Sequence, residues 1–315
     1  MKKTKALVLL NMGAARSKDE LKTFLLNMFN DENIISIKNK TLRSMLASFI
    51  VLLRHNSAWE NYEQIGGSSP LHKLTDDLIL KLQEVLPKYY ITTAMRYTSQ
   101  FAQTALAKIN KEGITDITLL PLYPQYSTTT TKSSLDDFLS KIDGNMNVNI
   151  NIIEPFYKNE LYNQAIVNNI KESIKDYLSY ELIFSAHGLP QKIIDKGDVY
   201  QKHIEQNVKI LSDMLKDQNI NFGSISLAYQ SKVGPMKWLT PSLDDSLKDF
   251  KDKNILIYPI SFIIDNSETV FELDIEYREI AQHIGIKDYK VVKCLNDDEM
   301  FVSAVKGMIM TMKCL

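Results

Sequence analysis

The amino-acid sequence predicts an α/β protein with two doubly wound domains, each built on a parallel sheet. Three observations support this fold class: short unbroken apolar runs, helical stretches between them, and a chain of 315 residues, roughly two domains long. A strand of a parallel sheet is covered on both faces, so it is apolar throughout and lacks polar alternation. Apolar strands that alternate with helices are typical of βαβ units.

Eight apolar runs are expected to form the strands, four in each half of the chain. In order they are Ala6–Asn11, Ile91–Tyr97, Ile117–Leu122, Val148–Ile153, Leu182–Ala186, Ile225–Tyr229, Ile255–Phe262 and Tyr289–Leu295. The fourth run lies near the middle of the chain, which favours two sheets over a single barrel. We therefore expect one domain over residues 1–146 and a second over residues 147–315.

Composition and missing motifs argue against several classes of protein. The formal net charge of -1 gives no overall basic field of the kind that binds nucleic acid. Cys294 and Cys314 form no CxxC pair, which argues against a cysteine-based metal site and a secreted disulfide scaffold. The apolar run after Lys5 is shorter than a signal-peptide core, and no stretch is long enough to span a membrane. The glycine patterns of dinucleotide and P-loop sites are also absent from the sequence. Because the cysteines suggest no disulfides and the N-terminus lacks a full signal-peptide core, we expect a cytoplasmic protein.

His187 is the first candidate functional residue, because ligands of open α/β sheets bind beyond the carboxyl ends of strands. It follows the run Leu182–Ala186 and precedes Gly188, which permits a tight turn. An imidazole at this place can accept a proton near neutral pH or coordinate a metal. The local sequence leaves a histidine that only caps the turn equally open.

Three glutamates after the run Ile255–Phe262 form the second candidate. Glu268, Glu272 and Glu276 are spaced four residues apart, so a helix places them on one face. A bound cation would offset the repulsion between them, since divalent metals accept carboxylate oxygens. Two other interpretations stay open at this point: Asp265 and Glu268 fit a capping box, and the remaining glutamates fit a solvated acidic face.

Two further segments follow strand ends. Tyr123, Tyr126 and Ser127 could line a flat, mostly apolar pocket, although Ser and Thr in this segment also suit a helix start. Farther along, Lys232 and Lys237 could face anionic groups and Trp238 could stack on a ring. The alternative is a tryptophan in the core with lysines at the surface.

Taken in order along the chain, these segments resemble the ferrochelatase family. The segments that carry the resemblance are Leu9–Gly13, Ile65–Leu71, Met95–Tyr97, Tyr123–Ser127, Ser185–Pro190, Tyr229–Leu239 and Asp265–Asp274. The resemblance implies two Rossmann-like, chelatase-like domains with the active site and its porphyrin in the cleft between them. It also implies a π-type distortion in the helix that carries the glutamates. Asn266 departs from the family, which commonly has histidine at that position.

The resemblance also implies roles for individual residues. His187 and Glu268 would be the catalytic pair and, with Glu272 and Glu276, the metal site. Residues implied in porphyrin binding are Met12, Arg96, Tyr123, Tyr126, Ser127 and Trp238.

The implied reaction inserts Fe²⁺ into protoporphyrin IX, as the last step of haem biosynthesis, while His187 removes pyrrole protons from a bent macrocycle. Fe²⁺ is a substrate here, and we expect no tightly bound cofactor and no iron–sulfur cluster. A cobalt chelatase for a related tetrapyrrole and a non-catalytic haem or metal carrier stay open as alternatives. The apolar segment Met45–Leu53, with Leu42, could contact a membrane or the porphyrin, or form an ordinary buried helix.

Overall fold

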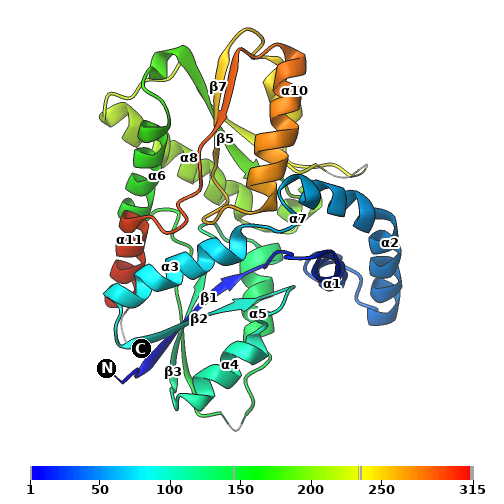
Figure 1. Ribbon diagram of the computed structural model, residues 1–315, viewed down its shortest axis with the longest axis vertical. Helices are drawn as coiled ribbons and strands as arrows, with labels where there is room; N and C mark the ends of the chain where they lie inside the picture. Colours follow the sequence, from blue (N-terminus) through cyan, green and yellow to red (C-terminus); the bar gives the residue numbers. More distant parts are fainter. Residues whose placement is uncertain (1, 145, 233, 235, 313–315) are drawn as a thin grey trace. The chain divides into compact units, whose positions relative to one another are not determined.

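The computed structural model describes residues 2–144, 146–232, 234 and 236–312 and contains two four-stranded parallel sheets (Figure 1). The first sheet consists of β1 (Lys5–Asn11), β2 (Tyr89–Met95), β3 (Asp116–Pro121) and β4 (Asn149–Ile152), in the order β2-β1-β3-β4. The second consists of β5 (Tyr180–His187), β6 (Ile225–Gln230), β7 (Asn254–Pro259) and β8 (Asp288–Val291), in the order β6-β5-β7-β8. The α/β class is therefore confirmed, and each of the eight apolar runs overlaps one of these strands.

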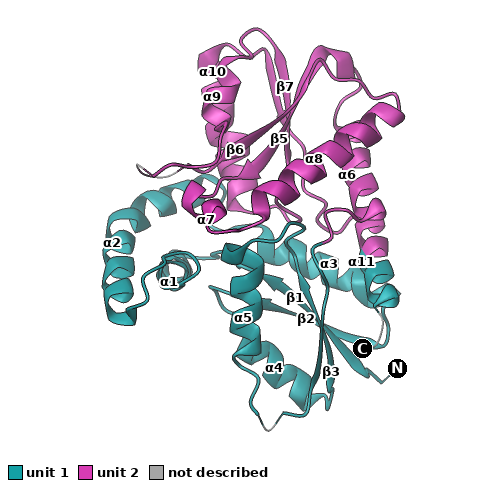
Figure 2. Cartoon of the chain, turned by 180° about the vertical axis from the view of Figure 1, so that it is seen from behind, with its two compact units in different colours: residues 1–155, 305–315 teal, residues 156–304 magenta. Residues whose placement is uncertain are grey.

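The chain divides into two compact units, which Figure 2 shows in different colours. One unit consists of residues 1–155 with 305–315, and the other of residues 156–304. β4, which follows residue 146, pairs in parallel with β3 in the first sheet. The partition also falls within α11 (Glu299–Thr311), the last helix.

Helices cover both faces of the first sheet. α4 (Ala102–Lys111) and α5 (Ser133–Leu139) bury apolar side chains such as Leu106 and Phe138 against Val8 and Leu119 of the sheet. On the opposite face lies α3 (Leu71–Val85) (Figure 1). α1 (Lys18–Phe29) and α2 (Lys40–Gln64) pack on each other, and together with α3 they account for the long gap between β1 and β2.

In the second unit, one face of the sheet is covered by α9 (Leu243–Lys248), η3 (Glu268–Glu276) and α10 (Tyr277–Ile284). α6 (Glu160–Ser173) and α8 (Tyr200–Asp217) pack together, and α8 also contacts β6. Two further short helices in this unit are η2 (Tyr177–Ser179) and α7 (Gln191–Asp195). No helix among the described residues has the length and apolar character needed to cross a bilayer.

Two segments of the described chain are π-helical rather than α-helical. η1 (Thr128–Lys132) follows β3 and leads into α5, and η3 follows β7 and leads into α10. The π-type distortion expected for the glutamate helix is therefore present. Hydrogen bonds in a π-helix run from residue i to i+5, which widens the turn and is common at functional sites.

Candidate active site

His187 ends β5 at the point where the order of the second sheet reverses. The chain passes from β5 to β6 on one side and then returns to β7 on the other. Open α/β sheets bind ligands beyond the carboxyl ends of the strands at such a switch point. The fold therefore places His187 where a ligand site is expected.

Glu268, the first residue of η3, is hydrogen-bonded to His187. Its Oε2 lies 2.8 Å from Nδ1 of the imidazole, and each side chain keeps about one third of its surface exposed (36% for His187 and 37% for Glu268). The ring of Phe262 meets the imidazole edge-on, with 6.4 Å between ring centroids. Because Nδ1 faces Glu268, Nε2 is the ring nitrogen that remains for a ligand.

The pair strongly favours a protonated imidazole. Burial opposes the charged form of His187, but the charge of Glu268, the hydrogen bond to it and the charge of Glu272 together outweigh burial. These influences raise the pKa of His187 from 6.5 to about 9. At neutral pH the free protein therefore holds His187 as an imidazolium.

The structure decides against a capping-box role for Glu268. The side-chain oxygen of Asn266 accepts the backbone N–H of Glu268 at 2.8 Å, so Asn266 caps this turn. The Asp265 carboxylate is engaged elsewhere, accepting from the Thr269 hydroxyl at 2.9 Å and from the Asn296 amide at 2.8 Å. The Glu268 carboxylate is thereby left for His187.

Glu272 lies one turn farther along η3 and is held by the end of β6. The Ser231 hydroxyl donates to its carboxylate at 2.7 Å, and the Gln230 amide donates at 3.3 Å. Burial and the charge of Glu268 raise the pKa of Glu272 from 4.5 to about 7, against the opposing effects of Ser231 and His187. This carboxyl group is therefore able to exchange a proton near neutral pH.

The predicted metal site is only partly assembled within the free chain. Glu268 contacts His187, whereas Glu272 is bonded to Ser231 and Glu276 is exposed at the end of η3. Across the described ranges there is no group of three or more His, Cys, Asp or Glu side chains arranged to hold a metal ion. The sequence analysis did not predict Gln230 and Ser231 as hydrogen-bond partners of Glu272. Their position at the carboxyl end of a predicted strand could have indicated such a role.

The loop after β6 lies beside the turn that follows His187. Leu239 N–H donates to the Leu189 carbonyl at 3.0 Å, and Trp238 forms an isolated antiparallel bridge with Pro190. Only glycine fits at position 188, because a Cβ there would lie 2.6 Å from the Gln230 carbonyl oxygen and 3.6 Å from the Trp238 ring. Trp238 is thus held next to the histidine turn.

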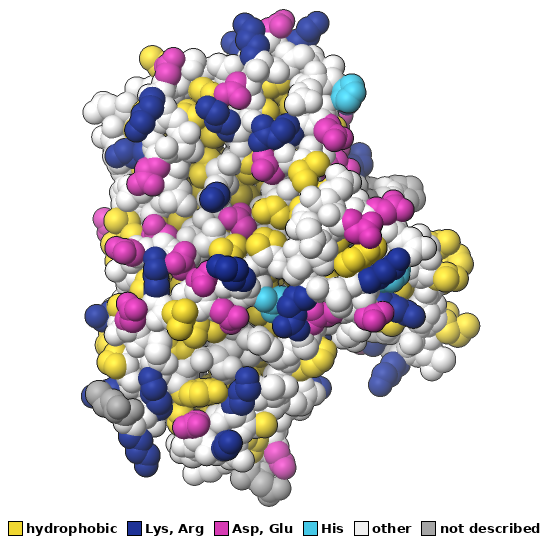
Figure 3. Space-filling view, in the orientation of Figure 1, with side chains coloured by type: hydrophobic (Ala, Val, Ile, Leu, Met, Phe, Trp, Pro, Cys, Tyr) yellow, Lys and Arg dark blue, Asp and Glu magenta, His cyan; other side chains and the backbone are white. Residues whose placement is uncertain are grey.

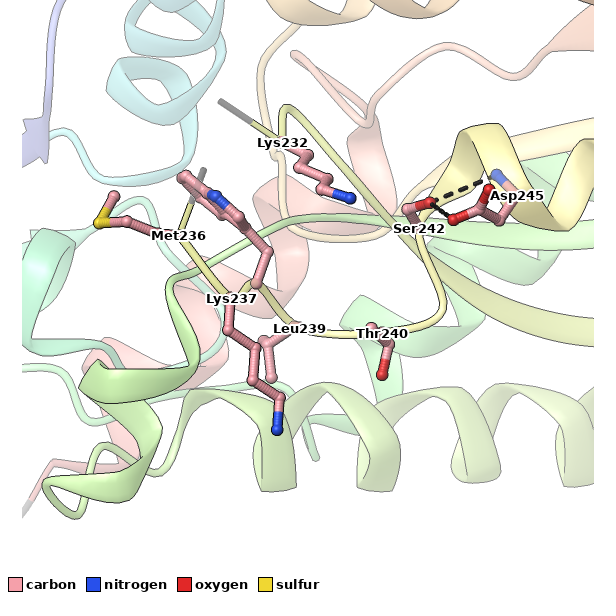
Figure 4. A pocket seen from close by; sticks show the side chains of 8 residues that line it. Lys232, Met236, Lys237, Leu239, Thr240, Ser242 and Asp245 are labelled. Carbon is pink, nitrogen blue, oxygen red and sulfur yellow. Dashed lines mark hydrogen bonds between the residues drawn. The ribbon is translucent and has the colours of Figure 1, made fainter. Parts of the chain in front are cut away.

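A pocket of about 140 Å³ opens in the same loop (Figure 4). Its lining residues are Lys232, Met236, Lys237, Trp238, Leu239, Thr240, Ser242 and Asp245. Lys232 and Lys237 are both exposed and point in different directions from the loop. Val233 and Pro235 of this motif, like Cys314, lie outside the described residues.

Most of the predicted porphyrin contacts in the first unit lie beyond the ends of β1 and β3, the switch point of the first sheet. Met12 directly follows β1, and Tyr123 and Tyr126 follow β3 and are partly buried. The Tyr123 hydroxyl lies 3.1 Å from the Ser134 hydroxyl. Ser127 is buried and caps η1 by accepting the Thr129 N–H at 3.1 Å, so its helix-start role is present.

Arg96 is held by an internal ion-pair network. Its guanidinium donates to Asp31 at 3.0 Å and to the Ser133 hydroxyl at 3.0 Å, and it lies 3.5 Å from Asp137. The buried Asp31 carboxylate also accepts the Tyr97 hydroxyl at 2.8 Å. Because two carboxylates face Arg96, its charge is largely balanced within the unit. A porphyrin-binding role for this residue stays a prediction.

Comparison with known proteins identifies the family. A model of the ferrochelatase family matches residues 4–313. The chain is 51% identical to a ferrochelatase of Nitratiruptor sp., covering 96% of this chain and 97% of that protein. It is 50% identical to a ferrochelatase of Campylobacter concisus, with 96% of each chain covered, and 47% identical to one of Sulfurimonas denitrificans, with 96% of this chain and 97% of that protein covered.

Solved structures share the fold. The chain resembles SirB from Bacillus subtilis with Fe³⁺, with a TM-score of 0.58 and 11% identity over 98% of this chain and 94% of that one. It also resembles the sirohydrochlorin chelatase SirB in complex with cobalt, with a TM-score of 0.54 and 9% identity over the same shares. The match to the family model spans nearly all of the sequence, including both sheets and the His187–Glu268 pair. The chain belongs to the ferrochelatase family.

Proposed function

We propose that this chain is a ferrochelatase, a lyase that inserts Fe²⁺ into protoporphyrin IX to form protohaem, the last step of haem biosynthesis. The observation that carries the proposal is the His187–Glu268 pair, 2.8 Å apart, at the switch point of the second sheet in a chain of this family. Fe²⁺ is a substrate in this proposal, and the protein supplies no resident cofactor or iron–sulfur cluster.

The reaction must overcome three barriers, and the proposed residues address two of them. Fe²⁺ must lose water ligands, the planar macrocycle must expose its nitrogen lone pairs, and two pyrrole N–H protons must leave. We assign proton removal to His187 Nε2, because Nδ1 faces Glu268 and a carboxylate there stabilises the imidazolium that forms. Glu268, Glu272 and Glu276 supply oxygen ligands to the incoming cation.

The order of proton transfers follows from the charge state of the free protein. With its pKa raised to about 9, His187 is protonated at neutral pH and must release that proton before it can act as a base. The arriving cation favours this release, because a positive charge nearby lowers the pKa of an imidazolium. The released proton passes to solvent, because about one third of the His187 side chain is exposed and Glu272 is already assigned to the cation as a ligand.

The proposal is tested by anaerobic absorbance of the purified protein with protoporphyrin IX and Fe²⁺. Wild type should form haem. In His187→Ala, kcat should fall by a factor of roughly 10²–10⁴, the usual contribution of a general base. His283→Ala is the matched control, since His283 is an exposed histidine on α10 whose Nδ1 lies 2.7 Å from the helix backbone carbonyl of Glu279.

Four results would change the proposal. Metallation of coproporphyrin but not protoporphyrin would change the substrate, and insertion of Co²⁺ but not Fe²⁺ would favour the cobalt chelatase. No metallation of either porphyrin by either metal, with tight binding of haem, would favour the carrier. Equal kcat in His187→Ala and wild type would remove His187 from the mechanism.

We also propose a peripheral contact between α2 and the cytoplasmic surface of an anionic membrane. Five large apolar side chains on one side of α2 are 56–77% exposed, and hydrophobic side chains project at the outer edge of this region (Figure 3). They are Leu42, Met45, Phe49, Leu52 and Leu53. The opposite side buries Ala47 and Val51, so an ordinary fully buried helix does not describe this segment.

Charge supports an anionic bilayer as the partner of this face. The exposed residues Lys38, Lys40 and Arg54 flank it, and no Asp or Glu occurs between Asn33 and Trp59. A basic, apolar helix face of this kind binds anionic lipid surfaces. Phe49→Glu with Leu52→Glu should abolish co-sedimentation with phosphatidylserine vesicles, whereas Leu178→Glu, at an equally exposed site on η2, should not. Unchanged sedimentation of the α2 variant, or an altered KM for porphyrin instead, would overturn the membrane contact.

A further inference from the structure

The backbone of His187 is held by two side-chain hydroxyl groups from other elements of the second unit. The Ser261 hydroxyl oxygen accepts the His187 N–H at 2.9 Å, and the Tyr200 hydroxyl donates to the His187 carbonyl at 2.9 Å. Ser261 lies just beyond β7, and Tyr200 is the first residue of α8. Neither residue was singled out in the sequence.

The two hydroxyls bond to the peptide groups of His187, which lie past the end of the pairing between β5 and β7. On the β6 side of β5, Gly188 N–H donates to the Gln230 carbonyl at 2.9 Å. On the β7 side the strand pairing ends at Ser185 and Pro259, with one further bond from Ile260 N–H to the Ser185 carbonyl. The next peptide groups on that side belong to His187, and buried peptide groups require partners. Ser261 and Tyr200 supply them through side chains.

Tyr200 is placed for this contact by its own turn. Its N–H donates to the Asp198 carboxylate at 2.9 Å, which fixes the start of α8. Its side chain is buried, with 6% of the residue exposed, so the hydroxyl is directed at the His187 carbonyl inside the protein. Ser261 is only partly buried, and its hydroxyl meets the His187 N–H just beyond the end of β7.

We propose that Tyr200 and Ser261 are positioning residues that fix the direction of the His187 imidazole. The direction of a side chain follows its backbone, so clamping both peptide groups of His187 keeps Nδ1 at 2.8 Å from Glu268 and Nε2 aimed at the substrate. Neither hydroxyl acts on the substrate, and each acts through His187. The catalytic part of this inference rests on the proposed chelatase function.

Steady-state kinetics with protoporphyrin IX and Fe²⁺ test that part. Tyr200→Phe and Ser261→Ala should each lower kcat about 10-fold, and the double variant about 100-fold, with the KM for porphyrin unchanged. Ser261→Thr keeps the hydroxyl and should restore kcat. The matched controls are Tyr157→Phe, whose hydroxyl donates to Gln206 at 2.6 Å, and Ser212→Ala, whose hydroxyl donates to a backbone carbonyl of α8 at 2.8 Å.

Nuclear magnetic resonance of the free protein tests the geometry without any turnover. Wild type should show a downfield Nδ1–H signal for His187, from the hydrogen bond to Glu268, and the double variant should lose it while its melting temperature matches that of the controls. If wild type does not metallate a porphyrin, the proposed function fails and this signal still decides the positioning role. A double variant with wild-type kcat and an unchanged Nδ1–H signal, or controls that lose as much kcat, would overturn the inference.

Discussion

Replacing Glu268 with glutamine should lower the pKa of His187 from about 9 to below its ordinary value of 6.5. Burial is the largest influence on this imidazole and disfavours its charged form. The charge of Glu268 and the hydrogen bond to it reverse that effect, and the charge of Glu272 adds the smallest contribution. Glutamine keeps the size of the side chain but removes its charge, so burial prevails over what remains.

A fall of this size corresponds to more than a hundredfold loss of proton affinity, since each pKa unit is a factor of ten. About one third of each side chain is exposed, so solvent screens part of the pair and the effect on folding stability is smaller. The pH dependence of this contribution to folding stability has a definite sign, because the pKa of His187 is higher in the folded protein than in the unfolded chain. The pair stabilises the fold fully below pH 6.5, and this stabilisation is lost as pH rises through 9.

The measurement is a titration of the histidine Cε1–H resonances from pH 5 to 10. The chain has five histidines, and His187→Ala assigns the signal. Glu279→Gln, an exposed change on α10, is the control and should leave the His187 pKa unchanged. A value that stays near 9 in Glu268→Gln would refute the electrostatic account of the pair.

Two further predictions concern stability. Because the folded-state pKa of Glu272 is raised from 4.5 to about 7, the unfolded chain loses this proton first, and wild type loses stability as pH rises through that window. In urea unfolding, the free energy of unfolding of Glu272→Gln should therefore increase relative to that of wild type as pH rises from 4.5 to 7. A difference between the two proteins that stays constant over this range would contradict the prediction. Gly13→Ala should cost about 2–5 kcal/mol, because φ is +86° and a Cβ would lie 2.2 Å from the Thr98 hydroxyl. Gly113→Ala, with φ of +66° and open space around it, should cost only about 1–2 kcal/mol in the same assay, and equal losses would argue against the steric contribution.

The strands could be predicted because burial on both faces leaves a direct trace in the sequence, but their ends could not. Ile260 and Ile263 are fully or almost fully buried although β7 ends at Pro259. Val292 and Leu295 are buried in the same way beyond β8, which ends at Val291. Apolar character reports burial and not backbone pairing, so the predicted runs extended past the last paired residue.

The positions of site residues at strand ends could be predicted from the sequence. The partners that their side chains contact could not. His187 was expected from its place after β5, and the fold confirms that place at a switch point. The choice between a cap and a partner of His187 for Glu268 needed coordinates, because 81 residues separate the two. Arg96 was named as a porphyrin contact through the family resemblance, and that role stays a prediction. Its ion pair with Asp31 could not be foreseen, because Asp31 lies 65 residues earlier and leaves no local signal.

The two π-helical segments have a consequence for the ancestry of the chain. π-Helices make up well under 1% of residues in globular proteins, yet η1 follows β3 and η3 follows β7, and these strands hold the same place in sheets of the same order. A single origin of this rare turn requires fewer evolutionary events than two separate origins at matching positions. We infer that a single ancestral half-chain already contained the widened turn before its gene was duplicated. The two segments now differ in their side chains: η3, in residues 156–304, carries the glutamates, and η1, in residues 1–155, carries hydroxyl groups.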